Sequence, residues 1–412
     1  MAGDEPTAVH VGARILHEGG SAADAATAMF FTLAVTYPVA AGLGAGGICV
    51  AHDPASNTNE AIEFLPRDTA GGGAFAMPGA VRGMATLQGA YGRLPWQRVI
   101  VSAEGDAATG FPISAALGFR INSALATIRL DPALSAEFLD AATNPKKIGT
   151  VVSNPDLATT LSAIRTQGAG GFYRGSVAEK IADYAVSQKG GPSLAELNVY
   201  SDAREAASSF KAGNLIVYGA PQHTGTMAYT SAMISKLVGP DGQLLAPGNF
   251  VAAIAQATKQ SLDQFKIASL PQDLGATGFA AVDSNGEAVA CGVTMNGRFG
   301  SAHTVPGTGV TFAAAPSSGQ AGLSAAFLSP MIATDGGGAL ALTAVGAGGP
   351  NGTASMFYAL LRKGLQTDGP VARSTGMAPY NTIDVIACTD DVCVPASDPS
   401  GPGLGLAVSL SN

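Results

Sequence analysis

The groups with chemical potential in this sequence are hydroxyl side chains, glycine-rich loops and a few histidines. A catalytic serine of the α/β-hydrolase kind lies in a Gly-x-Ser-x-Gly turn, and the 412-residue sequence contains no such motif. We interpret His223, within residues 221–225, as a loop histidine rather than a general base. We interpret His303 as a surface residue, with a position facing a pocket as the alternative.

The glycine-rich loop at residues 42–47 runs into an apolar strand predicted over residues 48–52. In dinucleotide-binding and phosphate-binding loops the strand comes before the glycines. The order here is reversed, so the loop predicts close backbone packing rather than a phosphate site. A second glycine run, at residues 346–349, precedes a helix predicted over residues 353–365.

The four cysteines fall into two pairs of different character. Cys388 and Cys393 enclose a short acidic turn, a spacing that a hairpin disulfide can close, with two unpaired thiols as the alternative. A disulfide there would suit an exported protein. Cys49 and Cys291 lie in apolar strand-like runs and are predicted to be buried, unpaired small side chains. No histidine pair with ligand spacing accompanies the cysteines, which argues against zinc.

The composition predicts a globular protein with a large core. Hydrophobic residues make up 47% of the chain and charged residues only 13%, with a net charge of −8 and no basic cluster that would indicate nucleic-acid binding. The longest apolar run, around residues 25–34, is interrupted by two threonines and followed by Pro38, so it is too short to span a membrane. The first residues carry no basic and apolar segments of a secretory signal.

These candidate groups must be positioned by helices and hairpins in a mixed arrangement. Helices are predicted over residues 5–18 and 22–35, the second with a capping box and apolar on all sides, and residues 77–220 read as mainly helical. Two turn signals, at residues 283–286 and 335–338, each separate a pair of apolar strands. Strands and helices without regular alternation favour layered α/β packing.

Several segments in order resemble the gamma-glutamyltransferase (gamma-glutamyltranspeptidase) family. The resemblance runs from about residue 5 to residue 365 and rests on residues 19–26 with the 42–47 loop, 77–79 with 91–96, 171–175, 276–282 with 293–300, and 329–332 with 346–349. The resemblance implies an N-terminal-nucleophile hydrolase of the α+β class, a four-layer αββα sandwich. It also implies that residues 1–412 form one domain, with 1–275 corresponding to the large subunit and 276–412 to the small subunit.

The family's chemistry, as the resemblance implies it, begins with a precursor that cuts itself. The new N-terminal threonine is the nucleophile, and its own α-amino group takes part in the base system. It forms an acyl-enzyme with a gamma-glutamyl amide, and water or an amino acid then accepts the acyl group. The reaction needs an oxyanion hole but no cofactor and no metal.

The resemblance places the nucleophile at Ala276 and the assisting threonine at Thr294, both without a gap. Alanine has no hydroxyl, so neither self-cleavage nor acyl transfer can follow the family route. Three explanations compete. Ala276 is an engineered substitution that traps the precursor, or a natural loss that leaves a silent binding protein, or Thr277 has taken over the role of nucleophile. The last needs a one-residue slip, which would put the side chain on the opposite face of the strand.

The remaining site residues follow from the same resemblance. Gly348 and Gly349 match the paired glycines of the oxyanion hole. Asn296 matches a residue that contacts the amino end of the substrate, whereas the acid expected near residues 312–316 is absent. Leu65 stands where the family has its carboxylate-binding arginine, and Arg67, two residues later on the same strand face, is the substitute.

The function that the resemblance implies is hydrolysis or acyl transfer at a small amide or gamma-glutamyl-like molecule, with no nucleic-acid or membrane partner. The alternative is a silent family member, or a trapped precursor, that binds a small ligand or a protein. Because the gamma-glutamyl clamp is incomplete, ordinary gamma-glutamyl substrates are expected to be poor ones. A mature periplasmic or secreted protein is expected, with the cytoplasm as the alternative.

Overall fold

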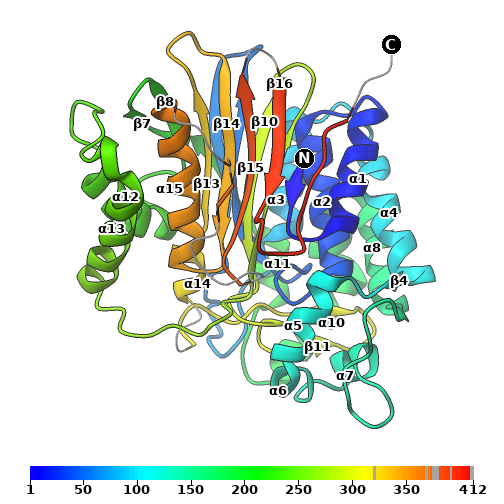
Figure 1. The fold of residues 1–412 in the computed structure, drawn as a ribbon. Helices are drawn as coiled ribbons and strands as arrows, with labels where there is room; N and C mark the ends of the chain where they lie inside the picture. Colours follow the sequence, from blue (N-terminus) through cyan, green and yellow to red (C-terminus); the bar gives the residue numbers. More distant parts are fainter. Residues whose placement is uncertain (319–321, 367–369, 371, 374–379, 390–391, 409–412) are drawn as a thin grey trace.

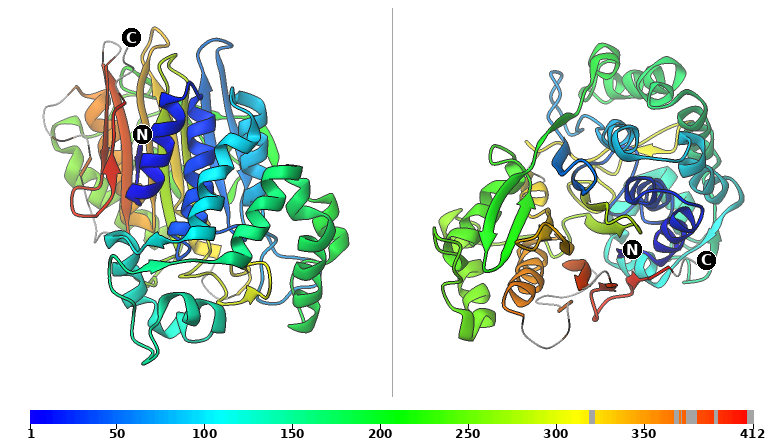
Figure 2. Two further views of the ribbon diagram at one scale, coloured as in Figure 1. Left: turned by 90° about the vertical axis from the view of Figure 1, so that its right-hand side faces the viewer. Right: turned by 90° about the horizontal axis from the view of Figure 1, so that it is seen from above.

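Two antiparallel sheets packed face to face form the centre of the molecule, and helices cover both outer faces (Figure 1). The computed structural model describes residues 1–318, 322–366, 370, 372–373, 380–389 and 392–408. The predicted four-layer αββα sandwich is confirmed. The view from above in Figure 2 shows the helices outside the two sheets.

The first sheet contains the strand that begins at the predicted nucleophile position. Its strands, in spatial order, are β17 (Leu404–Gly405), β1 (Ala2–Gly3), β9 (Ala276–Val282), β10 (Ala288–Thr294), β2 (Gly46–Asp53), β3 (Thr58–Phe64) and β6 (Ala203–Ala206). Those of the second sheet are β16 (Val392–Ser397), β15 (Thr382–Thr389), β14 (Leu340–Ala347), β13 (Ser329–Thr334), β8 (Leu215–Gly219) and β7 (Ser208–Ala212).

The helices divide between the two outer faces. Against the first sheet and on its flank lie α1 (Pro6–His17), α2 (Ala22–Thr36), α3 (Ala80–Tyr91), α4 (Trp96–Thr109), α8 (Pro155–Gln167), α9 (Gly170–Tyr173), α10 (Gly175–Ser187) and α11 (Leu194–Val199). Against the second lie α12 (Gly225–Leu237), α13 (Phe250–Gln264) and α15 (Pro350–Gly364).

Shorter elements gather mainly at the end of the sandwich where β9 begins. They are α5 (Ala115–Ser123), α6 (Leu125–Ile128), α7 (Pro132–Phe138) and α14 (Gly322–Ala326), and the two-stranded pairs β4 (Phe111–Pro112) with β5 (Val151–Val152) and β11 (Thr304–Val305) with β12 (Val310–Thr311). A 3₁₀ turn, η1 (Pro247–Asn249), precedes α13. None of the described helices is both long and apolar enough to cross a bilayer.

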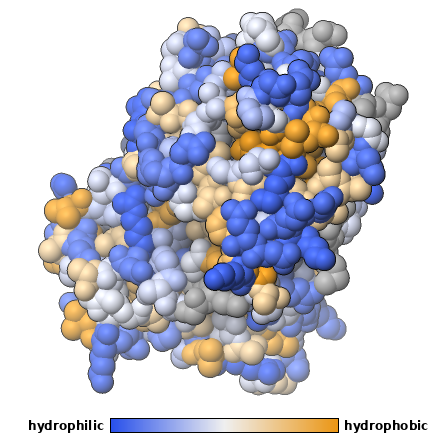
Figure 3. All heavy atoms as spheres, turned by 90° about the vertical axis from the view of Figure 1, so that its left-hand side faces the viewer, coloured by the Kyte–Doolittle hydropathy of each residue, from blue (hydrophilic) through white to orange (hydrophobic). Residues whose placement is uncertain are grey.

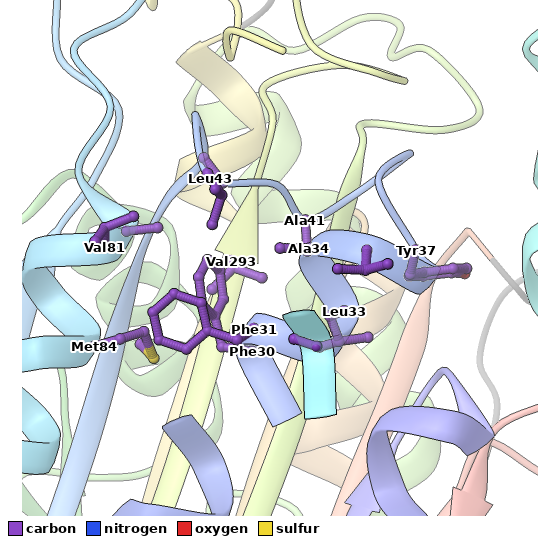
Figure 4. Packing of buried hydrophobic residues seen from close by; sticks show 14 of the residues in the cluster. Phe30, Phe31, Leu33, Ala34, Tyr37, Ala41, Leu43, Val81, Met84 and Val293 are labelled. Atoms are coloured by element: carbon purple, nitrogen blue, oxygen red, sulfur yellow. The ribbon is translucent and has the colours of Figure 1, made fainter. Parts of the chain in front are cut away.

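The core next to the site is built by α2, which is buried along its whole length, as its apolar sequence predicts. The predicted capping box is present: the Ser21 hydroxyl accepts from the Asp24 N–H, and the Asp24 carboxylate accepts from the Ser21 N–H. Figure 4 shows Phe31 of α2 and Met84 of α3 packed close to Val293 of β10. The strand that carries Thr294 therefore rests on a fixed apolar layer.

α12 and α13 form the outer surface of the helical layer over the second sheet. Figure 3 shows this side of the molecule, where hydrophilic side chains cover much of the surface and hydrophobic ones form separate patches. Leu245 and Phe265 are among the exposed apolar residues of this region. Isolated apolar side chains of this kind are normal on a protein surface.

The prediction that residues 77–220 are mainly helical holds for α3 to α11 but missed several strands. Residues 77–220 are helical only in part, because β6, β7 and β8 lie in their last portion. β6 and β7 alternate between more and less exposed positions, but they are short and contain few large apolar residues. Their sequences therefore give only a weak strand signal. β7 and β8 nevertheless supply one edge of the second sheet.

The cysteines form two disulfides. Cys388–Cys393 joins β15 to β16, in agreement with the bridged alternative. Cys49 and Cys291, predicted to be unpaired, are joined across β2 and β10, where they are direct antiparallel partners. That prediction was wrong because 242 positions separate the two residues, and only the strand pairing brings them together.

Candidate active site

Position 276 opens β9, and the alanine there lies directly opposite Thr294 of β10. The two positions that the resemblance singles out are thus antiparallel partners in the first sheet. The Ala276 side chain is 1% exposed and belongs to an apolar cluster that includes Leu65, Met227 and Leu328. The environment of this position is therefore apolar, apart from the hydroxyl groups on the neighbouring strand.

The carbonyl group of Gly275, immediately before position 276, is held by two donors. The Thr294 hydroxyl donates to this oxygen at 3.0 Å, and the Met295 N–H donates to it at 2.9 Å. Ser324 Oγ lies 2.6 Å from Thr294 Oγ1, and both side chains are buried. Two hydrogen bonds to a carbonyl oxygen polarise it and would stabilise negative charge there.

Ser324 was not singled out by the sequence. It lies in α14, outside the motifs that carry the family resemblance. Only the fold brings α14 against the end of β10. No local pattern in the sequence announces this contact.

Thr277 points away from this group, as expected for the next residue along a strand. Its hydroxyl donates to Asp4 Oδ2 at 2.5 Å, and the Thr382 hydroxyl donates to the same oxygen at 3.0 Å. Burial raises the pKa of Asp4, while these two hydroxyl donors act in the opposite direction. Thr277 is fully buried, so its hydroxyl is committed to Asp4 and lies on the other face of β9.

Gly348 and Gly349 connect β14 to α15 with backbone conformations that suit glycine. Their φ angles are +86° and +146°, and a side chain on Gly348 would collide with the Tyr380 carbonyl oxygen. Neither N–H donates to another described residue. Unpaired N–H groups just before a helix form a favourable place for an oxyanion.

These glycines are close to the segment that precedes position 276. A cavity of about 280 Å³ is lined by Gly348 together with Leu274, Asn351 and Asn381. A side chain on Gly349 would come within 3.7 Å of Leu274. Gly348 and Gly349 therefore lie next to Leu274, two residues before position 276.

Arg67, the predicted carboxylate-binding residue, does not point toward Ala276. The Arg67 side chain is 45% exposed and forms a salt bridge with Glu63 at 3.3 Å. Leu65, not Arg67, joins the apolar cluster around Ala276. Arg67 therefore lies toward solvent, and its role in binding a ligand stays a prediction.

Asn296 follows Thr294 in a tight left-handed turn, with φ of +56°. Its N–H donates to Thr294 Oγ1 at 2.8 Å, and its side-chain Nδ2 donates to the Ala314 carbonyl at 3.0 Å. Asn296 Oδ1 is buried and accepts no hydrogen bond from a described residue. This oxygen is the kind of acceptor that an N–H or ammonium group needs.

The histidines are not placed as bases for this site. His223 is exposed and pairs with Glu205 at 3.2 Å, and its ligand atoms lie within 4.8 Å of those of Glu205 and Glu63. This group is largely at the surface, and Glu63 is already paired with Arg67. His303 contacts the Ser301 carbonyl at 2.7 Å and stacks at a tilt near Phe75.

A buried ion pair that the sequence did not reveal underlies the site. Arg120 of α5 is fully buried and pairs with Asp273, whose side chain is 1% exposed. Arg120 Nη1 donates to the Ala276 carbonyl oxygen at 3.1 Å, and Asp273 Oδ1 accepts from the Gly275 N–H at 2.8 Å. The pair thus contacts the backbone on both sides of the Gly275–Ala276 bond.

Comparison with known proteins establishes the family and the fold of this chain. The sequence model of the family described as Gamma-glutamyltranspeptidase matches residues 8–264. The chain belongs to the gamma-glutamyltranspeptidase family. The matched residues end before Ala276, so the roles of Ala276 and the later site residues stay predictions.

Individual relatives cover the chain more broadly. Glutathione hydrolase 3 of Arabidopsis thaliana is 26% identical over 373 residues, covering 75% of this chain and 58% of that protein. The acylase ACY 1 proenzyme of Pseudomonas sp. (strain V22) is 26% identical over 375 residues, covering 74% of this chain and 67% of that protein. The chain thus spans under two thirds of the Arabidopsis relative.

The fold of this gamma-glutamyltranspeptidase family member extends the likeness to nearly its whole length. The crystal structure of cephalosporin acylase from Bacillus halodurans superposes with a TM-score of 0.73 at 16% identity. The superposition covers 99% of this chain and 95% of the acylase. At that identity the likeness shows a shared fold, which includes the strands on which Ala276 and Thr294 lie.

Proposed function

We propose that this chain carries the acyl-transfer site of the gamma-glutamyltranspeptidase family without its nucleophile. It recognises a small amide or gamma-glutamyl-like molecule, stays in one piece and does not form an acyl-enzyme. The observation that carries the proposal is the placement of the Ala276 methyl group opposite Thr294, beside a Gly275 carbonyl that already has two donors.

The missing hydroxyl explains why the reaction would stop. In a self-cleaving chain, the hydroxyl oxygen of residue 276 attacks the Gly275 carbonyl carbon, and the carbon–nitrogen bond breaks as the nitrogen gains the hydroxyl proton. Water then hydrolyses the resulting ester and frees both the carboxylate and the hydroxyl. The methyl group of Ala276 supplies neither the attacking oxygen nor the proton.

Ligand recognition in this proposal uses groups that remain in place. The N–H group of Gly348, which lines the neighbouring cavity, and that of the adjacent Gly349 would donate to a carbonyl oxygen of the ligand. Asn296 Oδ1 would accept from an N–H of the ligand. Arg67, which is partly exposed, would exchange Glu63 for a ligand carboxylate.

The competing function is amide hydrolysis or acyl transfer by a shifted nucleophile, Thr277. Its hydroxyl is hydrogen-bonded to Asp4 and lies on the opposite face of β9 from Ala276. An active Thr277 would require that strand to slip by one residue, which would break the pairing of Ala276 with Thr294. The observed geometry therefore favours the silent site.

The expected location follows from the two disulfides. Cys49–Cys291 and Cys388–Cys393 together leave no unpaired cysteine in the chain. Disulfides persist in oxidising compartments and are rare in the cytosol. We propose that the protein works in the periplasm or outside the cell, and fractionation of its native host with a cytosolic marker tests this.

The direct test is the mass of the purified, reduced chain after prolonged incubation. The proposal predicts a single species of 40.9 kDa. A fragment that begins at Thr277 would contradict it and support the shifted nucleophile. Even with Ala276→Thr, gamma-glutamyl anilides are expected to be poor substrates, because Leu65 fills the position of the expected arginine. Rapid turnover by that variant would show that Arg67 rebuilds the clamp.

A further inference from the structure

Arg120 heads the large, fully buried side chains in the described part of the chain, and its guanidinium makes four hydrogen bonds. Nε donates to Asp273 Oδ2 at 2.9 Å, and Nη2 donates to Asp273 Oδ1. Nη1 donates to the Tyr37 hydroxyl at 3.3 Å and to the Ala276 carbonyl at 3.1 Å. The guanidinium also lies over the Tyr37 ring, 5.2 Å from its centre.

The cost of burying this ion pair points to a role beyond packing. Taking two charges out of water is expensive, and a buried pair is often replaceable by apolar residues without loss of stability. Here Arg120 and Asp273 come from segments 153 positions apart in the sequence. The pair joins α5 to the segment that leads into β9, where the proposed site begins.

The two residues hold the backbone around one peptide bond. Asp273 Oδ1 accepts from the Gly275 N–H at 2.8 Å, and Arg120 holds the carbonyl oxygen of Ala276. Between them, the Gly275 carbonyl oxygen receives Thr294 Oγ1 and the Met295 N–H. The Gly275 N–H, the Gly275 carbonyl and the Ala276 carbonyl are thereby each held by a partner from another segment or from the side chain of Asp273.

The turn at Gly275 adds to the need for such fixation. Its φ is +64°, and a side chain there would come within 2.0 Å of the Gly297 carbonyl oxygen. The chain therefore makes a close backbone contact immediately before position 276. A small rotation of this peptide would move the Gly275 carbonyl away from its donors.

We propose that Arg120 is a positioning residue that, through its ion pair with Asp273, sets the orientation of the Gly275–Ala276 peptide bond. This inference rests on the proposed function, because the orientation matters for chemistry only if position 276 belongs to an acyl-transfer site. Arg120 does not touch a reacting atom. It acts by holding the carbonyl of Ala276, and through Asp273 the N–H of Gly275, so that Gly275 faces Thr294.

The experiment uses a double variant that avoids leaving one buried charge alone. Arg120→Met with Asp273→Asn removes both charges, while the Asn side-chain oxygen can still accept from the Gly275 N–H. The matched control is Arg165→Met with Glu104→Gln, which removes an ion pair of the same chemistry from a more exposed place. Both double variants are made in the full chain.

Hydrogen exchange in the Ala276 chain tests the positioning without any chemistry. The Met295 amide, whose acceptor is the Gly275 carbonyl oxygen, is expected to exchange at least about tenfold faster in the Arg120/Asp273 double variant, because that oxygen turns away from it. The amides of residues 48–51 in β2 are expected to keep their rates, and the control pair is expected to change none of them. Unchanged exchange at Met295 would overturn the proposal.

Cleavage in an Ala276→Thr background gives the second readout. The Arg120/Asp273 double variant is expected to slow self-cleavage at least about tenfold, because small misplacements of reacting groups cost large factors in rate. The control pair is expected to leave the rate unchanged, and Arg120→Lys alone is expected to keep part of it. Equal rates with and without the Arg120–Asp273 pair would overturn the role of Arg120.

Hydrogen exchange and self-cleavage together distinguish a failure of the proposed function from a failure of the proposal about Arg120. If Ala276→Thr alone never cleaves, the proposed function is wrong, and the exchange measurement still decides whether Arg120 orients the peptide. If Ala276→Thr cleaves and the double variant cleaves equally fast, the proposed function stands and the inference about Arg120 falls.

Discussion

The long-range disulfide Cys49–Cys291 is expected to stabilise the fold much more than the local one, Cys388–Cys393. A disulfide reduces the entropy of the unfolded chain, and this effect grows with the logarithm of the loop that it closes. For a sequence separation of 242 the relation gives about 5.5 kcal/mol, against about 2 kcal/mol for a separation of five. The expected difference is therefore about 3 kcal/mol.

The assay compares each disulfide with its own reduced form, so that no side-chain volume changes. A Cys388→Ala/Cys393→Ala chain retains only the long-range bridge, and a Cys49→Ala/Cys291→Ala chain retains only the local one. Urea unfolding of each, with and without reductant, gives the loss in free energy of unfolding. Thiol titration of the unreduced, denatured natural chain is expected to find no reactive thiol, since all four cysteines are bridged.

Three results would refute this reasoning. Four reactive thiols in the unreduced chain would show that neither bridge forms, and two thiols from Cys49 and Cys291 would restore the original expectation of unpaired residues. A loss on reduction that is equal for the two single-bridge chains would show that loop length does not govern the effect.

Two further perturbations test the local geometry. Burial raises the pKa of Glu287 to about 7 from its ordinary value of 4.5, so the folded state binds the carboxyl proton more tightly than the unfolded state does. The contribution of this proton to stability is fully present below pH 4.5 and is lost as the pH rises through about 7. The free energy of unfolding should fall by up to about 3 kcal/mol over that range, and a Glu287→Gln chain with the same slope would contradict this. Gly348→Ala should destabilise the fold by more than about 2 kcal/mol, because its Cβ would meet the Tyr380 carbonyl. Gly19→Ala, which has nearly the same φ but open space, should cost only about 1 kcal/mol, and equal thermal shifts for the two would refute the steric argument.

The fold was accessible from the sequence wherever a local pattern was strong. Serine and aspartate at the start of α2 gave its capping box, and the turn at residues 283–286 gave the β9–β10 hairpin. Family resemblance added the sandwich and singled out Ala276 and Thr294, which the structure shows to be strand partners. These features depend on neighbours in the chain or on motifs in fixed order.

The parts that escaped prediction depend on contacts between distant segments. Arg120 lies on a short helix that carries no motif, and the neighbouring residues in the sequence do not predict its pairing with Asp273. Ser324 meets Thr294 only after α14 has packed on the sheet. The Cys49–Cys291 bridge likewise requires the strand order, because each cysteine by itself looks like a small core residue.

The most direct test of the silent acyl-transfer site is the mass of the Ala276→Thr chain after incubation. The restored hydroxyl would lie beside the Gly275 carbonyl, which Thr294 and Met295 already polarise. The account predicts conversion into two fragments, residues 1–275 and 276–412. A folded variant that stays at its intact mass would contradict the claim that position 276 is the nucleophile position.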